Sequence, residues 1–241
     1  MEIWRLTTGA IPGAWVDERD GAAAVVTGIP GWGRNGVWTT RRDVAPEILD
    51  ELLGRVAEAD VPHSLQLREG APAELIGIAR RHGLVFDADE PVMVLDDPAP
   101  LASFAGVDGF AVRRLGPHEG ALHARVAAPS FDERVEVFEA AASPEILSVP
   151  GIRCFAGEAG GEVVSTAMAV THLGVTAVFG VATSPPHRGR GYGAAVTAHA
   201  LLDGFGAGAG WAWLQADPDA TSLYERLGFR AVETCAIWVH E

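Results

Sequence analysis

A basic, glycine-rich turn follows a strand and leads into a helix in the stretch Val181-Ala182-Thr183-Ser184-Pro185-Pro186-His187-Arg188-Gly189-Arg190-Gly191-Tyr192-Gly193. The apolar run 176–182 is typical of a buried strand, and two prolines end it. Residues 194–205 have the pattern of a helix. The sequence therefore predicts a strand, a turn and a helix in this order.

The turn has the chemistry of a diphosphate-binding site. Gly189, Gly191 and Gly193 stand at alternate positions, where a backbone without side chains can approach a ligand and turn its N–H groups inward. The N-terminus of the following helix adds partial positive charge, and Arg188 and Arg190 add full charges.

Two other interpretations fit part of this turn. Gly189, Gly191 and Ala194 satisfy the dinucleotide pattern G-x-G-x-x-A, and Asp217 follows the next strand as that motif requires. However, six residues separate the strand from the first glycine, and a single strand-helix-strand unit follows in the sequence, whereas a dinucleotide fold needs several. A purely structural glycine turn is the other alternative. A free diphosphate suits the arrangement best.

The composition is that of a globular protein of one large or two small domains, with 241 residues of which 48% are hydrophobic and 21% charged. The 18 basic and 32 acidic residues give a net charge of −14. Such a charge repels nucleic acids and anionic membranes and is compatible with amine substrates, so we expect neither nucleic acid nor membrane as a partner. The sequence shows no signal-peptide pattern and no apolar run of membrane-spanning length, which predicts a cytoplasmic protein with Cys154 and Cys235 as free thiols.

A segment rich in proline and small residues, 98–107, has the composition of a linker and predicts domains at 1–97 and 108–241. Each half contains a strand, a helix ended by glycine, and a further strand. These are 64–67, a helix ending at Gly83 and 92–95 in the first half, and 213–216, a helix ending at Gly228 and 235–239 in the second. An internal duplication and a chance similarity between two ordinary units are both compatible with this pattern. The remaining patterns predict strands over 23–29, 36–40 and 110–115, a meander over 154–157, 162–172 and 175–182, and helices over 44–57, 117–127 and 131–141.

Two motifs together resemble those of the GNAT superfamily, the acyl-CoA-dependent N-acyltransferases. The turn 188–193 is similar to the family's R/Q-x-x-G-x-G/A motif, and Thr221-Ser222-Leu223-Tyr224-Glu225-Arg226-Leu227-Gly228-Phe229 is similar to its later motif, a tyrosine four residues before Gly-Phe. The resemblance covers roughly 108–241. It implies a mixed α/β (α+β) fold of two GNAT-like halves, each a mixed, mostly antiparallel sheet flanked by helices, with a splayed parallel strand pair in the C-terminal half.

The resemblance also implies that the acyl donor is acetyl-CoA and that no metal takes part. Backbone groups of Val181, Ala182 and Thr183 would bind the pantetheine arm, and an amide near Val181 would polarise the thioester carbonyl. The pyrophosphate would be held by the turn, at Arg188, Gly189, Arg190, Gly191, Tyr192, Gly193 and Ala194. Asp217 stands where the family often has an asparagine that touches pantetheine, and a carboxylate can accept but not donate there.

Tyr224 matches the family's tyrosine and is the expected proton donor to the leaving thiolate, since a thiol has a pKa of about 8.5 and a phenol of about 10. A core tyrosine on an amphipathic helix is the alternative role. The strand 175–182 lacks the glutamate that several members use as general base. Glu158 and Glu162 are candidates by proximity in sequence, or else solvated turn charges. The histidines show no metal-ligand spacing, and His118 and His123 are five residues apart, off a single helical face.

The expected reaction is acetyl transfer to a primary amine, on a small molecule or a peptide, by direct attack without a covalent enzyme intermediate. The alternative is a non-catalytic acyl-CoA sensor or scaffold. The first half resembles a degenerate copy of the fold, because it has no glycine turn between Thr40 and Leu52 and has Ala79 in place of the tyrosine. We therefore expect one active site per chain, with the first half helping to shape the acceptor site. Trp32, which lies between two glycines, could line that site, and a homodimer is compatible with this arrangement.

Overall fold

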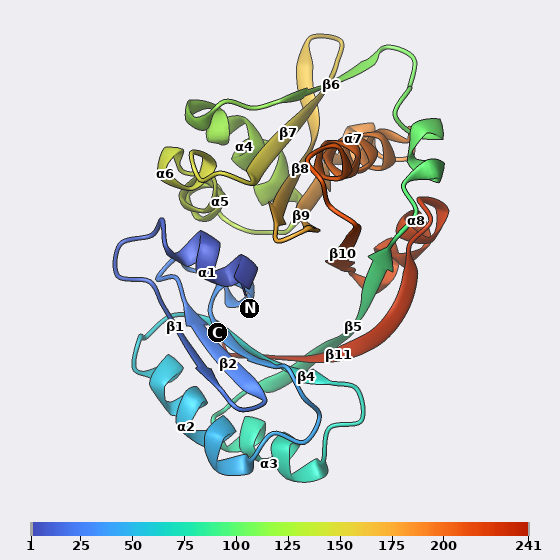
Figure 1. The fold of residues 1–241 in the computed structure, drawn as a ribbon. Helices are drawn as coiled ribbons and strands as arrows, with labels where there is room; N and C mark the ends of the chain where they lie inside the picture. The colour runs from blue at the N-terminus through green and yellow to red at the C-terminus, as the bar shows by residue number, and fades with distance from the viewer. Residues whose placement is uncertain (1, 241) are drawn as a thin grey trace. The chain divides into compact units, whose positions relative to one another are not determined.

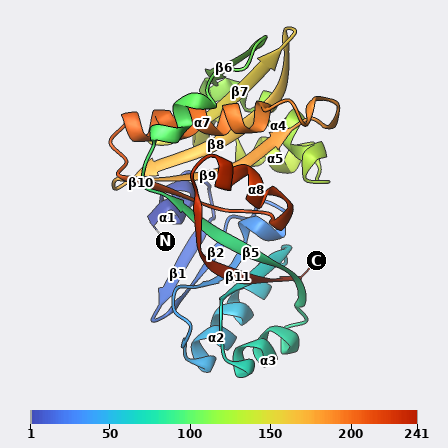
Figure 2. The ribbon, with the colours of Figure 1, turned by 90° about the vertical axis from the view of Figure 1, so that its right-hand side faces the viewer.

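The computed structural model describes residues 2–240 (Figures 1 and 2). It contains two compact units, Met1–Val92 with Val232–Glu241, and Met93–Ala231. The domain boundaries expected from the sequence, 1–97 and 108–241, stay a prediction. In the compact units, the strand residues 232–240 belong to the first unit. Within residues 2–240, no helix combines the length and the apolar character needed to cross a membrane.

The first unit contains part of a mixed sheet, with both antiparallel and parallel neighbours. Its elements are α1 (Glu2–Thr8), β1 (Trp15–Arg19), β2 (Ala22–Val26), η1 (Trp32–Arg34), β3 (Gly36–Thr39), α2 (Pro46–Ala57), β4 (His63–Arg68), α3 (Ala73–Arg81), most of β5 (Val85–Leu95) and most of β11 (Arg230–His240). Strands β1, β2 and β3 pair antiparallel, β3 and β4 pair parallel, and β4 and β11 pair antiparallel. The last strand of the sequence thus lies between β4 and β5 in the sheet order.

Helices α2 and α3 cover one face of this sheet (Figure 1). Helix α2 begins at Pro46, where the missing N–H removes no intrahelical hydrogen bond. Its apolar residues recur with the period of a helix and are completely buried, namely Leu49, Leu52, Leu53 and Val56. Helix α1 supplies an aromatic contact, in which the rings of Trp4 and Trp38 lie 4.9 Å apart.

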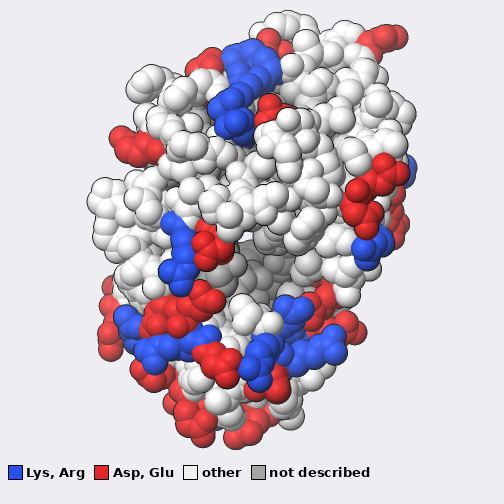
Figure 3. Space-filling view, in the orientation of Figure 1, with Lys and Arg blue, Asp and Glu red and all other residues white. Residues whose placement is uncertain are grey.

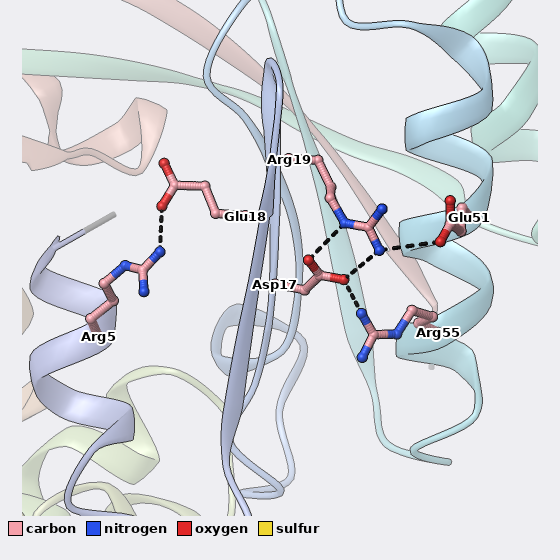
Figure 4. A network of polar contacts seen from close by, with 6 residues as sticks. All are labelled: Arg5, Asp17, Glu18, Arg19, Glu51 and Arg55. Carbon is pink, nitrogen blue, oxygen red and sulfur yellow. Dashed lines mark hydrogen bonds and ion pairs between the residues drawn. The ribbon is translucent and has the colours of Figure 1, made fainter.

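A network of charged side chains joins β1 to α2 (Figure 4). Asp17 accepts a hydrogen bond of 2.8 Å from Arg19 and also pairs with Arg55. Arg19 reaches Glu51 at 3.2 Å, and Arg55 lies over the Trp15 ring at 4.9 Å from its centre. Since most of these groups are exposed, each pair contributes about 1 kcal/mol or less, and the buried face of α2 supplies most of the stability of this packing.

A more buried ion pair holds β11 against β4. Glu233 accepts two hydrogen bonds from Arg68, and its side chain is only 9% exposed. The register places Cys235 opposite Arg68 and His240 opposite His63, where the two imidazole rings stack with centres 4.9 Å apart. These contacts fix a strand that arrives from a distant part of the sequence.

The second unit is an antiparallel meander followed by a parallel strand. Its elements are η2 (Ala99–Ser103), β6 (Phe110–Arg114), η3 (Pro117–Glu119), α4 (Gly120–Ser130), α5 (Val135–Ala141), α6 (Pro144–Leu147), β7 (Ile152–Ala159), β8 (Glu162–His172), β9 (Val175–Thr183), η4 (Pro185–His187), α7 (Tyr192–Gly206), β10 (Trp211–Gln215), η5 (Pro218–Ala220) and α8 (Thr221–Arg226). Strands β6 to β9 pair antiparallel in sequence order, and β9 pairs with β10 in parallel.

Helices pack on both faces of the second sheet. On one face, Gly204 of α7 lies so close to β9 that a β-carbon there would be 2.2 Å from the Thr176 hydroxyl oxygen. On the other face, His123 of α4 lies against Gly180 of β9. The expected fold class, a mixed α/β fold with parallel and antiparallel strands flanked by helices, is confirmed.

The predicted strands and helices appear with shifted ends, and α5 begins at Val135 rather than 131. The elements α1, β1 and α6 were not expected from the sequence pattern. Each unit has antiparallel strands that lead into one parallel pair, β3 with β4 and β9 with β10. This shared order favours an internal duplication over a chance similarity.

One asparagine organises the loop that contains Trp32. Asn35 is completely buried, and its Oδ1 accepts hydrogen bonds from the N–H groups of Thr27 (2.9 Å) and Gly28 (3.2 Å). Its Nδ2 donates to the carbonyl oxygens of Ile29 (2.8 Å), Gly31 (3.2 Å) and Pro62 (3.2 Å). A single side chain therefore satisfies five backbone groups, four in the loop 27–31 and one at Pro62.

We expect Asn35→Ala to lower the free energy of unfolding by about 3 kcal/mol, because it leaves several buried backbone groups without a partner. Chemical denaturation followed by circular dichroism measures this change, with Glu58→Ala, at an exposed helix end, as the control. A loss below about 1 kcal/mol in Asn35→Ala would contradict this role.

Candidate functional site

The candidate site begins at a bulge in the middle of β9. Thr166 of β8 lies opposite Ala182, and Met168 lies opposite Phe179, so Gly180 and Val181 share one partner position. Gly180 has a φ of 55°, in the region that glycine adopts without strain. Val178 and Val181 both pack into the cluster around α7, which shows that the alternation of side chains shifts by one residue at the bulge.

Strands β9 and β10 separate next to this bulge. Their parallel pairing joins Trp211, Ala212 and Trp213 to 175–177 and goes no further. Strand β9 continues to Thr183, so its backbone edge beyond Ala177 is not paired with β10. The expected splayed pair is therefore present, and its open edge offers backbone hydrogen-bonding groups to a ligand.

The glycine turn leads from β9 into α7. Gly189 and Gly191 have φ values of 75° and 82°, and Gly191 is the N-cap residue of α7. The first helical hydrogen bond in this turn runs from the N–H of Ala195 to the carbonyl of Gly191 at 3.0 Å. The amides of the preceding residues in the first turn thus point outward from the helix end, as a bound anion would require.

The two arginines of the turn fold back on it. Arg188 Nε donates to the carbonyl of Thr183 at 3.1 Å, and an Arg190 guanidinium nitrogen donates to the carbonyl of Pro186 at 3.4 Å. Both side chains are exposed. These bonds hold the positive charges near the helix N-terminus while leaving guanidinium donors for a ligand.

The end of β9 is partly engaged by the protein itself. The carbonyl of Ala182 accepts a hydrogen bond from Ser165 at 2.9 Å, and that of Thr183 accepts from Arg188 and from Ser130. Neither Ser165 nor Ser130 was expected at the site from the sequence pattern. Of the three residues expected to bind pantetheine, Val181 beside the bulge is thus the strongest remaining candidate for carbonyl contacts.

Tyr224 lies in the apolar cluster that contains Val178 and Val181. Its side chain is 8% exposed, and its ring meets Phe229 edge to face at 6.0 Å. Burial, with a smaller contribution from the charge of Asp217, raises the pKa of Tyr224 to about 12. The phenol is therefore protonated at neutral pH, and the structure brings it to the same side of β9 as α7.

Asp217 and Tyr192 have structural contacts of their own. The Asp217 carboxylate accepts from the N–H of Asp219 at 2.8 Å and so caps the short helix η5 before α8. The Tyr192 ring stacks on Phe110 with centres 4.2 Å apart, so Tyr192 can contribute to the turn through its backbone amide. A role of either residue toward a ligand remains a prediction.

The candidate bases from the sequence lie away from the bulge. Glu158 accepts a 2.8 Å hydrogen bond from Arg113, and Glu162 is exposed at the start of β8. Glu162 precedes Ala167, opposite the bulge, by five positions of β8, or about 17 Å along an extended strand. By contrast, His123, which was not expected as a base from the sequence, lies beside the bulge. Over residues 2–240, no three side chains of the metal-binding types are grouped to hold an ion.

The corresponding region of the first unit has a different chemistry. Between β3 and α2, Arg41 pairs with Asp20 at 2.8 Å and with Asp43 at 3.1 Å. Helix α2 begins with Pro46, which has no N–H to offer, and carries Glu47 in its first turn. Ala79 is completely buried in the first core. This helix start is therefore poorly suited to an anion.

Charges of both signs lie close together on the visible face of the first unit, and the visible face of the second unit carries fewer of them (Figure 3).

Comparisons with known proteins agree with this geometry. The sequence model of the Acetyltransferase (GNAT) family matches residues 121–229. No curated protein matches the sequence significantly.

Similar solved structures cover nearly the whole chain. A GCN5-related N-acetyltransferase from Kribbella flavida has 22% identity and a TM-score of 0.74, over 99% of this chain and 93% of that one. A GCN5-related N-acetyltransferase-like protein from Streptococcus suis has 16% identity and a TM-score of 0.66, over 99% and 92%. A tandem GNAT protein from the clavulanic acid biosynthesis pathway has 15% identity and a TM-score of 0.61, over 100% and 88%.

At these identities the likeness of the solved structures concerns the fold. The family match is more specific, because residues 121–229 contain the bulge, the glycine turn and Tyr224. Residues 121–229 therefore form a GNAT acetyltransferase domain, and the fold of the chain is similar to that of GCN5-related N-acetyltransferases.

Proposed function

We propose that the second unit transfers an acetyl group from acetyl-CoA to a primary amine. The observation that carries this proposal is the convergence of three features on one strand: the bulge at Gly180, the open edge of β9 and the glycine turn that follows it. GNAT enzymes generally use acetyl-CoA, and these features provide a backbone track that ends in an anion site. A turn that served only to connect two elements would not require the open edge beside it.

The residues of the turn hold the pyrophosphate in this proposal. The amides of residues 189–194 donate to the phosphate oxygens, and Arg188 and Arg190 supply charge. Val181 and the N–H groups at the end of β9 bind the pantetheine arm, since the carbonyls of Ala182 and Thr183 already accept bonds from the protein. Asp217 acts on this arm indirectly, through the short helix η5 that it caps.

The bulge supplies the hydrogen-bond donor that polarises the thioester carbonyl. It interrupts the regular ladder at Val181, so a backbone N–H there can be directed at the thioester oxygen as negative charge develops on it. Holding the amine and the thioester together lowers the barrier further, by on the order of 7–11 kcal/mol when the alignment is good.

Tyr224 donates a proton to the leaving sulfur. For a thiol with an ordinary pKa of about 8.5, transfer from a phenol with a pKa of about 12 is uphill by ~5 kcal/mol. A sulfur bound beside the same apolar cluster also loses solvent, which raises the pKa of its thiol and narrows this gap. The buried environment therefore keeps the donor protonated and makes the thiolate a better proton acceptor.

The first unit does not bind acetyl-CoA in this proposal. It has the ion-paired Arg41 and Pro46 in place of the glycine turn, and Ala79 in place of Tyr224. Each chain then has one active site. The acceptor is an amine on a small molecule or a peptide, and we place the protein in the cytoplasm. The competing function is an acyl-CoA sensor, which would share the binding site and lack turnover.

Release of free thiol from acetyl-CoA across a diverse panel of amines separates these two functions. We expect release with at least one class of amine, and Tyr224→Phe should lower kcat by about 10²- to 10⁴-fold because it removes a general acid. The affinity for acetyl-CoA should change less than threefold. Equal turnover in the variant would refute the acid assignment, and binding by the wild type without release for any amine would favour the sensor.

The ionisation of Tyr224 gives an independent test. The chain has two tyrosines, so Tyr224→Phe leaves only Tyr192. In an alkaline titration followed by tyrosinate absorbance, we expect the variant to lose a step near pH 12. Because the folded-state pKa lies above the unfolded value of about 10, the stability from this group is complete below pH 10 and is lost as the pH rises toward 12. Loss of a step near pH 10 instead would show a solvent-exposed phenol.

A further inference from the structure

His123 of α4 lies against the bulge of β9. The side chain is 2% exposed, and its ring occupies the space in which a side chain at position 180 would lie. A β-carbon on Gly180 would be 3.2 Å from Cε1 and 3.5 Å from Nε2 of His123. The edge of the ring that carries Nε2 therefore faces the bulge, and Gly180 itself is partly exposed there.

The hydrogen bonds of His123 determine which ring nitrogen carries the proton. Nδ1 lies 2.7 Å from the hydroxyl oxygen of Thr166. That hydroxyl donates its one hydrogen to the carbonyl of Phe155 at 2.9 Å, so it can only accept from His123. In the neutral ring Nδ1 is therefore the donor, and Nε2, toward Gly180, has the lone pair.

The bulge gives this nitrogen a position close to the expected reaction. Phe179 and Gly180 face the α4 side of β9, and the Phe179 ring meets Trp213 of β10 edge to face at 5.9 Å. The α7 side holds the cluster of Tyr224. A thioester placed at the bulge would thus have a proton donor on one side of the strand and His123 Nε2 on the other.

Both neutral and charged groups lie on the elements around His123. Phe138 of α5 meets the ring edge to face at 5.8 Å, and Cys154 of β7, near Thr166, has a pKa raised by burial to about 12. Glu119 of η3 pairs with Arg113 at 3.0 Å. The charged side chains of the neighbouring helices are exposed, namely Arg125 of α4 and Glu136 and Glu139 of α5.

We propose that His123 is the general base that deprotonates the acceptor amine, with Thr166 as the positioning residue that fixes its tautomer. This inference rests on the acetyl transfer proposed above. Nε2 takes one proton from the acceptor ammonium, and the neutral nitrogen then forms the C–N bond. The C–S bond breaks, sulfur takes the proton of Tyr224, and the surplus proton on the new amide nitrogen returns to the phenolate. The imidazolium releases its proton to solvent, so the net products are the amide, free CoA thiol and one proton.

The test uses an amine accepted by the wild type and compares His123→Gln with His118→Gln. His118 is exposed on η3 and serves as the matched control. We expect His123→Gln to lower kcat/KM by about 10²- to 10³-fold at pH 7. The deficit should shrink as the pH approaches the pKa of the amine, because the substrate is then already neutral. Acetyl-CoA affinity and the control variant should stay within threefold of the wild type.

A purely structural role would lower the rate by the same factor at every pH, and this result would overturn the proposal. Unchanged kcat/KM in His123→Gln would overturn it as well. A wild type that turns over no amine would refute the proposed function and the base with it, whereas an active wild type with a pH-independent deficit refutes the base alone.

If His123→Gln fails to fold, the pair Thr166→Val and Thr166→Ser carries the test. Valine cannot accept from Nδ1, so Thr166→Val should lower kcat by about tenfold or more and shift the acidic limb of the pH–rate profile. Serine keeps the hydroxyl, and Thr166→Ser should recover most of the rate. Equal losses in the two variants would overturn the role of the hydrogen bond.

Discussion

The bulge at Gly180 is the constraint on which the site depends. An extra residue in β9 shifts the alternation of side chains, so Val178 and Val181 both face the cluster of Tyr224 while Phe179 and Gly180 face α4. The φ of 55° favours glycine, and a β-carbon there would make a tight contact of 3.2 Å with Cε1 of His123. Beyond Ala177 the edge of β9 is not paired with β10, and the glycine turn follows the end of this strand. One backbone irregularity thus positions a proton donor, a binding track and a histidine.

The sequence could predict the parts of the site that depend on local chemistry. The prolines after β9, the glycines of the turn and the helix after them act within a few residues of one another, and their roles follow from backbone geometry. Gly180 was not recognised, because a glycine inside an apolar strand has no local signal for a bulge. Its role depends on the register with β8 and on the ring of His123, which lies on α4 and precedes Gly180 by 57 residues.

The same limit applies to the fold. The strand 235–239 was evident from its apolar pattern, but its place beside β4 depends on Arg68 and Glu233, which are 165 residues apart. The first unit therefore contains a strand from the half that follows it in sequence. Helix α1 and strand β1 were missed because they are short and only partly buried, so their apolar periodicity is weak. Tertiary contacts rather than local propensity stabilise such elements.

The stoichiometry of acetyl-CoA binding tests the central claim most directly. Isothermal titration calorimetry of the full chain should give one site per chain. Gly191→Val, which places a branched side chain at a φ of 82° in the turn, should weaken binding at least tenfold in a protein that still folds. No binding to the folded wild type, two sites per chain, or full affinity in Gly191→Val would contradict the account.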